Sequence, residues 1–299
     1  MPRARSALVA GLGLVVGLGT LAGVVCIGLA LADDSPALDP VAASITAATI
    51  TTGRHERIDG PRGPIHVWIP RGYHADTGAT IIYVHGYWDT ADTAWTNHRL
   101  PEQFALSAVN AMFIVPEAPS TRGVAVNYPD LTEVIRLVED RTGELRGAAL
   151  TAALGHSGAY RTLETWFDEP LLDHVVLVDA LYGDEDRIVS WFEAVPSRRL
   201  ITIGEDTVLG TEAVADKIPG TYTLDQFPPA YDLWPAEART ARHVYIRAQY
   251  GHMQLVNQGI ALPSVLRLLP VELLADGPWQ LPLGSLPPPI DAAAGDARK

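Results

Sequence analysis

Short apolar runs alternate with amphipathic segments over most of the chain between residues 55 and 270. Runs rich in Val, Ile and Leu predict buried strands, and they lie at residues 79–84, 112–115, 175–178, 200–203 and 244–247. Apolar positions three or four residues apart predict helices at residues 100–109, 129–140, 187–194 and 253–269. Strands that alternate with helices indicate an α/β fold, with a mostly parallel sheet covered by helices on both faces. In such a fold the functional sites lie at the carboxyl ends of the strands.

Two other stretches complete this pattern. Residues 55–59 and 65–69 predict two short strands around Gly60-Pro61-Arg62-Gly63, which has the residue types of a hairpin turn. Residues 205–242 break the alternation, because their Pro and Gly residues interrupt any long helix while Trp234 and several other aromatic residues add apolar surface. A segment of this kind, inserted late in an α/β chain, predicts either a cap over the site or a surface excursion.

The ends of the chain differ from its centre. Residues 1–32 begin with Met-Pro-Arg-Ala-Arg and continue as an uncharged apolar run, which predicts a signal peptide or an N-terminal membrane anchor. The small residues before Asp33 favour cleavage after Ala32, and therefore an extracytoplasmic protein that is secreted, periplasmic or anchored. We interpret residues 33–54 as a linker, 55–280 as the folded domain and the Pro-rich 281–299 as a disordered tail.

Composition narrows the possible partners. The formal net charge of −13 argues against binding to nucleic acid or to anionic membranes, so membrane contact is expected only through the N-terminal segment. The single cysteine, Cys26, lies inside that segment, so thiol catalysis, disulfides and cysteine metal sites are excluded from the cleaved chain. No metal cluster and no cofactor motif is evident, and we expect neither a metal nor a cofactor.

The strongest candidate for chemistry is Ser157. An apolar run over residues 148–154 ends at Gly155-His156-Ser157-Gly158, and residues 159–167 predict a helix. A strand, a sharp turn and a helix with a serine at the turn are typical of the nucleophile elbow G-x-S-x-G, although Ala159 replaces the last glycine. The alternative is a helix N-terminus capped by the serine.

A serine nucleophile needs a base and an acid that orients the base. Of the nine histidines, His252 is best placed, because it follows the last predicted strand. The acid is left open between residues that follow the sixth and seventh strands. Asp206 is favoured, Asp179 is the alternative, and Glu205 is a third candidate.

Chemistry at a carbonyl also needs N–H donors for the oxyanion. The residue after the nucleophile, Gly158, supplies one, and Tyr87, which follows His85-Gly86 at a strand end, supplies the other. Trp88, His156 and Trp234 are candidates for substrate binding, and ordinary packing is the alternative interpretation for each.

These motifs together resemble the α/β-hydrolase superfamily over residues 55–270. The order His85-Gly86-Tyr87, Gly155-His156-Ser157-Gly158, Gly204-Glu205-Asp206-Thr207 and Gly251-His252 carries the resemblance. It implies an eight-stranded, mostly parallel sheet with serine, acid and histidine in that order. His-Gly-Tyr and Asp-Thr-Val also look like segments of secreted cutinases, in which the equivalents of Tyr87 and Asp206 supply an oxyanion N–H and the acid. In families whose acid follows strand six, Asp179 takes that role.

The sequence therefore predicts a secreted or membrane-anchored serine hydrolase of the carboxylesterase or lipase type, acting on a small or polymeric ester. A serine peptidase or amidase with the same triad is one alternative, because nothing in the residues separates ester from amide substrates. A non-catalytic binding protein with the same fold is another, because fold does not determine function.

Overall fold

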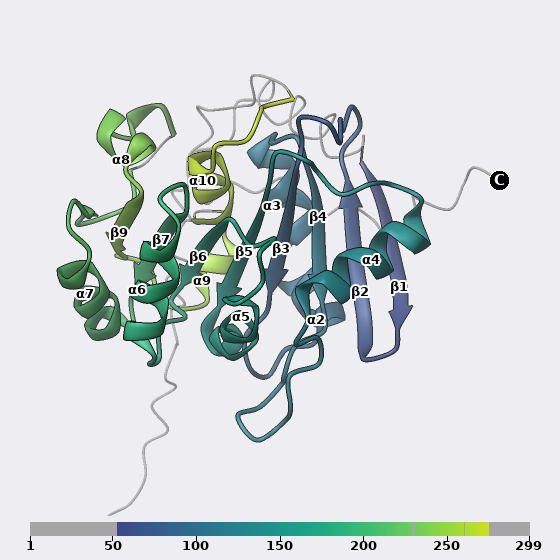
Figure 1. The fold of residues 1–299 in the computed structure, drawn as a ribbon, viewed down its shortest axis with the longest axis horizontal. Helices are drawn as coiled ribbons and strands as arrows, with labels where there is room; N and C mark the ends of the chain where they lie inside the picture. Colours follow the sequence, from purple (N-terminus) through teal and green to yellow (C-terminus); the bar gives the residue numbers. More distant parts are fainter. Residues whose placement is uncertain (1–52, 229–230, 260, 275–299) are drawn as a thin grey trace, which may run out of the picture. The chain divides into compact units, whose positions relative to one another are not determined.

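The computed structural model describes residues 53–228, 231–259 and 261–274. Within them a nine-stranded sheet has the order β1-β2-β4-β3-β5-β6-β7-β9-β8 (Figure 1). Strand β2 pairs antiparallel with β1 and β4, and every other pair is parallel. The strands are β1 (Arg54–Gly60), β2 (Gly63–Ile69), β3 (Ala79–Val84), β4 (Ala111–Pro116), β5 (Leu150–His156), β6 (His174–Val178), β7 (Arg199–Gly204), β8 (Tyr222–Leu224) and β9 (His243–Arg247).

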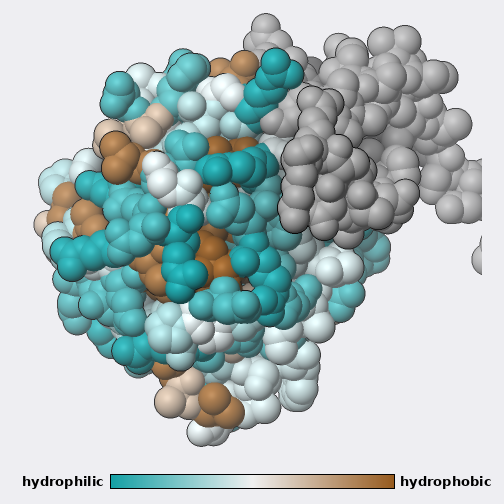
Figure 2. Space-filling model, turned by 90° about the vertical axis from the view of Figure 1, so that its right-hand side faces the viewer, coloured by the Kyte–Doolittle hydropathy of each residue, from teal (hydrophilic) through white to brown (hydrophobic). Residues whose placement is uncertain are grey.

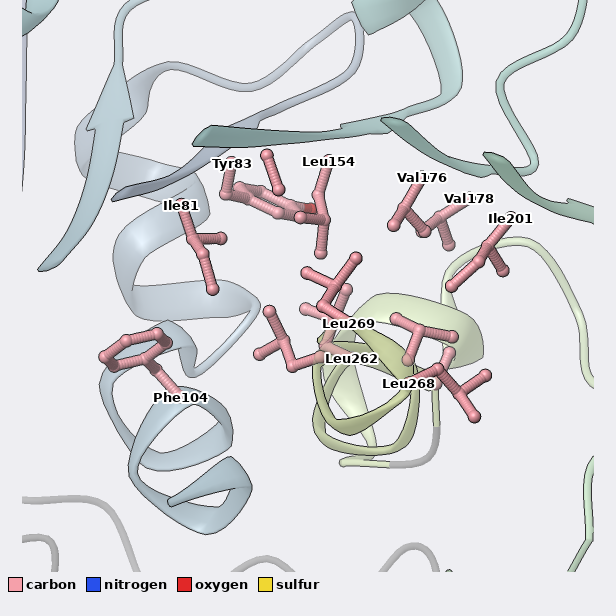
Figure 3. Packing of buried hydrophobic residues seen from close by; sticks show 14 of the residues in the cluster. Ile81, Tyr83, Phe104, Leu154, Val176, Val178, Ile201, Leu262, Leu268 and Leu269 are labelled. Atoms are coloured by element: carbon pink, nitrogen blue, oxygen red, sulfur yellow. The ribbon is translucent and has the colours of Figure 1, made fainter. Parts of the chain in front are cut away.

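Helices cover both faces of this sheet. One face packs against α2 (Ala91–Asn97), α3 (Leu100–Ser107), α8 (Ala236–Thr240), α9 (Gln254–Asn257) and α10 (Ala261–Leu268). The other face packs against α4 (Leu131–Thr142), α5 (Tyr160–Trp166), α6 (Glu185–Ala194) and α7 (Val208–Lys217). Alternate residues of each central strand enter the two cores, as the period of two requires. Figure 3 shows Leu262, Leu268 and Leu269 of the α10 region directed toward Leu154 and Val176 of the sheet.

The expected α/β architecture is confirmed, but the sheet has nine strands and not eight. The additional strand is β8, whose three residues lie in a segment that the sequence pattern did not assign to the sheet. The predicted helix over residues 253–269 is two helices, α9 and α10, separated near Gly259, which has φ +71°. A positive φ is accessible to glycine and ends a helix.

The described residues of 205–242 do not form a cap over the carboxyl ends of the strands. They contribute α7 to one face of the sheet and β8 to its edge. Helix α8 lies at the opposite end of the sheet, where the Arg199 guanidinium at the start of β7 donates to the carbonyl oxygens of Ala238 and Arg239 (Figure 1). The described part of the segment therefore extends the sheet and one of its helical layers.

The edge strand β1 is protected by charge. Arg54, Glu56, Arg57 and Asp59 alternate along it and form ion pairs with each other and with Glu144 and Asp92. Charged edge strands resist pairing with other chains. The face in Figure 2 is mostly hydrophilic, with apolar side chains in smaller patches.

The predicted signal or anchor at 1–32, most of the linker and the tail at 281–299 lie outside the described residues. Within the described residues, no helix combines the length and the apolar character that crossing a membrane requires.

The sheet brings the ends of five strands to one edge. Strands β3, β5, β6, β7 and β9 are parallel, so their carboxyl ends all lie at this edge, which is in the lower part of Figure 1. The residues that follow them are His85, Ser157, Asp179, Glu205 and Ala248. Every candidate of the predicted triad therefore follows a strand end at this edge.

Candidate active site

Ser157 occupies a strained turn at the end of β5. Its backbone has φ +53°, in the left-handed region that a serine rarely adopts, and a short 3₁₀ turn, Ser157–Ala159, leads directly into α5. The turn is tightly packed, since a Cβ atom at Gly155 would lie 2.0 Å from Cδ1 of Leu163 and 3.1 Å from Cβ of Ala159. The methyl group of Ala159 thus occupies the space above Gly155. An alanine is accommodated there because residue 155 has no side chain.

Two glycines bring the β3 loop against the serine. A Cβ atom at Gly86 would lie 2.7 Å from Cβ of Ser157, and a Cβ atom at Gly158 would lie 2.6 Å from the Tyr87 ring. Real Cβ atoms do not approach other atoms so closely, so both positions require glycine. The loop after β3 therefore lies directly beside the nucleophile turn.

The backbone N–H groups of Tyr87 and Gly158 are available as donors. Among the described residues, neither N–H makes a loop or turn hydrogen bond, whereas the next N–H, that of Trp88, donates to the Ser120 carbonyl at 2.8 Å. His85 fixes the loop, because its Nε2 accepts from the Ala118 N–H at 3.0 Å while Nδ1 lies 2.9 Å from the Gly86 carbonyl oxygen. Two free N–H groups on adjoining loops are the donors that an oxyanion needs.

His252 and Asp179 form a close pair across the edge of the sheet. Nδ1 of His252 lies 2.6 Å from Oδ2 of Asp179, and the His252 side chain is about a quarter exposed. The Asp179 side chain is fully buried, at the end of β6 and with φ +48°. A carboxylate on Nδ1 directs Nε2 outward as the basic nitrogen.

Asp179 is held as a carboxylate by five hydrogen bonds. Besides His252, the donors are the backbone N–H groups of Glu205, Asp206 and Thr207 and the Thr207 hydroxyl. Burial opposes ionisation of Asp179, but the bonds from His252, Glu205 and Thr207 outweigh it and hold its pKa well below the usual range.

The structure places Asp206 differently from the sequence-based preference. Its Oδ2 lies 3.8 Å from Nδ1 of His252, beyond hydrogen-bond distance, and its side chain is 61% exposed. Asp206 contributes a backbone N–H to Asp179 while its own carboxylate faces solvent. The Glu205 N–H also donates to Asp179, and the Glu205 side chain makes no hydrogen bond to Nδ1 of His252. The geometry thus favours the alternative, Asp179.

The acidic groups raise the basicity of His252. Burial lowers the pKa of the imidazole, but the hydrogen bond and charge of Asp179, followed by the charges of Asp206 and Glu205, outweigh burial and raise it above 6.5. An imidazole with a raised pKa is a stronger base for a serine hydroxyl.

The three residues expected to bind substrate have different environments. Trp88 is 89% exposed beside Tyr87, with ring centroids 6.5 Å apart. His156 is 2% exposed, its ring lies 4.5 Å from that of His252, and burial followed by the charge of His252 lowers its pKa to about 3. Trp234 is 2% exposed and packs edge-on against Phe227 at 6.0 Å. The structure therefore places Trp234 in the core, whereas Trp88 is open to a ligand.

Tyr182 was not identified from the sequence. It follows Asp179 in the loop after β6, is 45% exposed, and its ring lies 5.9 Å from that of Tyr160. Partial burial raises the pKa of its phenol, and a hydrogen bond with the Ser157 side chain acts in the opposite direction. The feature of the sequence that could have indicated Tyr182 is its position shortly after Asp179, an acid candidate at a strand end.

Comparisons with known proteins give fold-level likeness only. No protein-family model and no curated protein matches the chain, whereas 396 chains of solved structures do. A feruloyl esterase module from Clostridium thermocellum in complex with sinapinate is 12% identical, with a TM-score of 0.48, over 71% of this chain and 88% of that chain. An S-formylglutathione hydrolase from Agrobacterium tumefaciens is 9% identical, with a TM-score of 0.45, over 72% and 94%. A Pyrobaculum calidifontis esterase is 14% identical, with a TM-score of 0.41, over 78% and 91%.

The topology itself decides the fold. The strand order β1-β2-β4-β3-β5-β6-β7-β9, with one antiparallel strand next to a parallel series, carries a strained serine directly after its central strand β5. The chain has the α/β-hydrolase fold. In that fold the acid follows a later strand and the histidine comes last, which is the order of Asp179 and His252 here.

One group of residues in this α/β-hydrolase fold has the composition of a metal site. Ligand atoms of Asp179, Asp206 and His252 lie within 4.8 Å of one another, the one such group of three within the described residues. The carboxylate of Asp179 already accepts five hydrogen bonds, and Nδ1 of His252 points at it. The group is therefore saturated by its own contacts, and it fits a hydrogen-bonded pair better than a cation.

Proposed function

We propose that this protein is a serine hydrolase that cleaves carboxylic esters. The observation that carries the proposal is that the strained Ser157 follows β5 while Asp179, paired with His252, follows the neighbouring strand β6 at the same edge of the sheet. Ser157 is the proposed nucleophile, His252 the base, Asp179 the acid, and the Tyr87 and Gly158 N–H groups the oxyanion donors. With the uncharged N-terminal run, we propose an extracytoplasmic location.

The first proposed step forms the acyl-enzyme. Nε2 of His252 removes the proton of Ser157 as Oγ attacks the ester carbonyl carbon, and the carbonyl oxygen becomes an oxyanion that accepts from Tyr87 and Gly158. The tetrahedral centre collapses, the bond to the alkoxy oxygen breaks, and His252 returns the proton to the leaving alcohol. Asp179 stabilises the imidazolium that exists between these events.

The second step releases the acid. A water molecule loses its proton to His252 and attacks the acyl carbon, and the same two N–H groups donate to the second oxyanion. The bond to Ser157 Oγ breaks as His252 returns the proton to the serine. The products are a carboxylic acid and free enzyme, with no change in oxidation state.

The decisive experiment uses covalent labelling. A fluorophosphonate probe should label the wild-type protein and Ser157→Ala should remain unlabelled, because only an activated serine attacks phosphorus. Ser190→Ala, on the exposed face of α6, is the matched control and should be labelled like the wild type. Hydrolysis of p-nitrophenyl butyrate should fall by about 10⁴-fold or more in Ser157→Ala.

The same experiment separates the alternatives. Labelled protein that turns over peptide anilides faster than esters would indicate an amidase or peptidase. Folded wild-type protein that takes up no label would contradict the hydrolase proposal and indicate a binding protein.

A further inference from the structure

Five large apolar side chains are exposed around Ser157, each in a segment that follows a strand at the carboxyl edge. They are Trp88 after β3, Val124 after β4, Tyr182 after β6, Leu209 after β7 and Met253 after β9, and we call them the apolar rim. Trp88 and Leu209 are the most exposed, at 89% and 81%. Exposed apolar groups gathered at one edge of a molecule usually mark contact with a partner.

Contacts through Tyr87 and the loop after β4 join one side of the rim to the turn that carries Ser157. The Tyr87 ring packs against Gly158, and the centroids of the Tyr87 and Trp88 rings are 6.5 Å apart. The Trp88 N–H donates to Ser120, and the guanidinium of Arg161, on the helix that follows Ser157, donates to the Thr121 carbonyl at 3.3 Å. Val124 belongs to the same loop, because its N–H donates to Thr121.

Contacts also join the other side of the rim to α5, the helix that follows Ser157. Tyr182 packs on Tyr160 of α5, at 5.9 Å between ring centroids. The first turn of α7 touches the same loop, since a Cβ atom at Gly210 would lie 2.7 Å from the Leu181 carbonyl oxygen. Leu209 therefore lies next to the Tyr182 segment. Met253 directly follows His252 and is 44% exposed.

Trp88 gives a second indication. Its backbone has φ +66°, a conformation that bulky residues rarely adopt. The hydrogen bond from the Trp88 N–H to Ser120 holds this conformation. The indole itself has only an edge contact with Tyr87 and is almost fully exposed, so its surface is left for a ligand.

Charge indicates the nature of that partner. The exposed carboxylate of Asp206 lies on the same edge, and the chain carries a net charge of −13. An anionic surface would be repelled from the apolar rim, whereas an uncharged apolar surface would not. The partner must also present an ester to Ser157 if it is to be the substrate.

We propose that the apolar rim docks the enzyme on the surface of an uncharged, water-insoluble ester phase, so that the substrate is taken from a droplet and not only from solution. This rests on the proposed ester hydrolysis. Docking removes the five side chains from water and places the ester carbonyl over the nucleophile, and burial of apolar area supplies the free energy.

The chain offers matched controls. The other large exposed apolar residues, Leu145, Val195, Leu233 and Leu273, lie in segments that precede strands or pack near strand starts, at the opposite edge. We compare the rim variant Leu209→Glu/Val124→Glu with the control variant Leu145→Glu/Leu233→Glu. Both add two negative charges at exposed positions, and neither changes a residue of the triad or the oxyanion donors.

The experiment separates docking from chemistry. Adsorption to emulsified tributyrin is measured by depletion from the aqueous phase, with Ser157→Ala added to every protein so that no hydrolysis occurs. The rim variant should adsorb about ten-fold more weakly than the control variant. In proteins with Ser157 intact, hydrolysis of the emulsion should fall by a similar factor, while hydrolysis of dissolved p-nitrophenyl butyrate stays within about two-fold.

Two results would overturn the docking proposal. One is equal adsorption by the rim and control variants, and the other is a parallel loss on emulsified and dissolved ester. A wild-type protein that hydrolyses neither ester would contradict the proposed function instead, and adsorption would still test the rim.

Discussion

Ser157 and Asp179 are the two residues of the proposed triad whose backbones are strained. They end the neighbouring strands β5 and β6 with φ +53° and +48°. Asp tolerates this region better than Ser, and each such residue costs about 1–3 kcal/mol. The five hydrogen bonds on the Asp179 carboxylate and the glycine contacts of Ser157 are what hold these conformations. The site is consequently rigid before any substrate arrives.

At this scale the two aspartates near His252 should behave differently. Asp179→Asn should reduce kcat/KM by about 10³–10⁴-fold, because an amide cannot stabilise the imidazolium. Asp206→Asn should reduce it by less than about ten-fold, because its side chain makes no hydrogen bond to His252.

The pH profile supplies a further test of the same pair. The charge of Asp206 raises the pKa of His252, so its removal should lower that pKa and move the acidic limb of the kcat/KM profile to lower pH. A large loss in Asp206→Asn with normal activity in Asp179→Asn would contradict the assignment.

The sequence predicts Ser157 and His252 and prefers Asp206 as the acid, whereas the geometry around His252 favours the alternative, Asp179. Asp179 and Asp206 both follow strands, and a linear motif does not show which side chain points inward. Here the 205–207 turn directs its N–H groups at Asp179, and Asp206 consequently faces solvent. Trp234 is a substrate-binding candidate by sequence, but the structure buries it, because an aromatic residue in an irregular segment can equally pack in the core.

At the scale of elements, the turn between β5 and α5 depends on one missing side chain. Gly155→Ala would place a methyl group against Leu163, which is fully buried, and should destabilise the fold by about 1–3 kcal/mol. Ala159→Gly, the control at the same turn, removes a methyl group without a clash and should cost less. Urea denaturation measures both changes.

A double variant tests whether the clash with Leu163 causes the loss of stability in Gly155→Ala. Leu163→Ala in the Gly155→Ala background should destabilise less than the sum of the two single changes, because the clash is removed. Strict additivity would show that the glycine is required for another reason.

The long periodic elements were predictable, and the short ones were not. The central strands and α4 have clear apolar periodicity, whereas α2 has only seven residues, five of them weak helix formers, and begins with a capping box between Thr90 and Thr93. Strand β8 has three residues and exists because β9 offers a pairing edge. Elements this short carry too little periodicity to be predicted, and the tertiary contact with β9 is absent from the local pattern of β8.

For the whole molecule, buried imidazoles determine the response to acid. Burial lowers the pKa of His243 to about 4. His156 has a pKa of about 3 for the same main reason. The unfolded chain therefore binds protons first, and stability should fall as the pH drops from 6.5 toward 4. His252 acts oppositely, because its raised pKa contributes stability below 6.5 that is lost as the pH rises through the folded value.

His243 allows this to be measured. Its Nε2 lies 3.1 Å from Oγ1 of Thr202, and its Nδ1 lies 2.8 Å from Oγ1 of Thr221. His243→Gln removes one titrating group, so the urea midpoint should fall less between pH 7.5 and pH 5 than in the wild type, even if the variant is less stable at both. An equal fall in the two proteins would contradict the buried-imidazole explanation.

The turn that holds Asp179 has a consequence for recognising relatives of this chain. Residues 205, 206 and 207 each hold the acid through main-chain groups, and only Thr207 adds a side-chain bond. Side chains at 205 and 206 are thus free to drift during evolution, whereas inserting or deleting a residue between β7 and α7 would misalign all three donors. The number of residues in this turn, and not the identity of its side chains at 205 and 206, is therefore the feature that relatives should share.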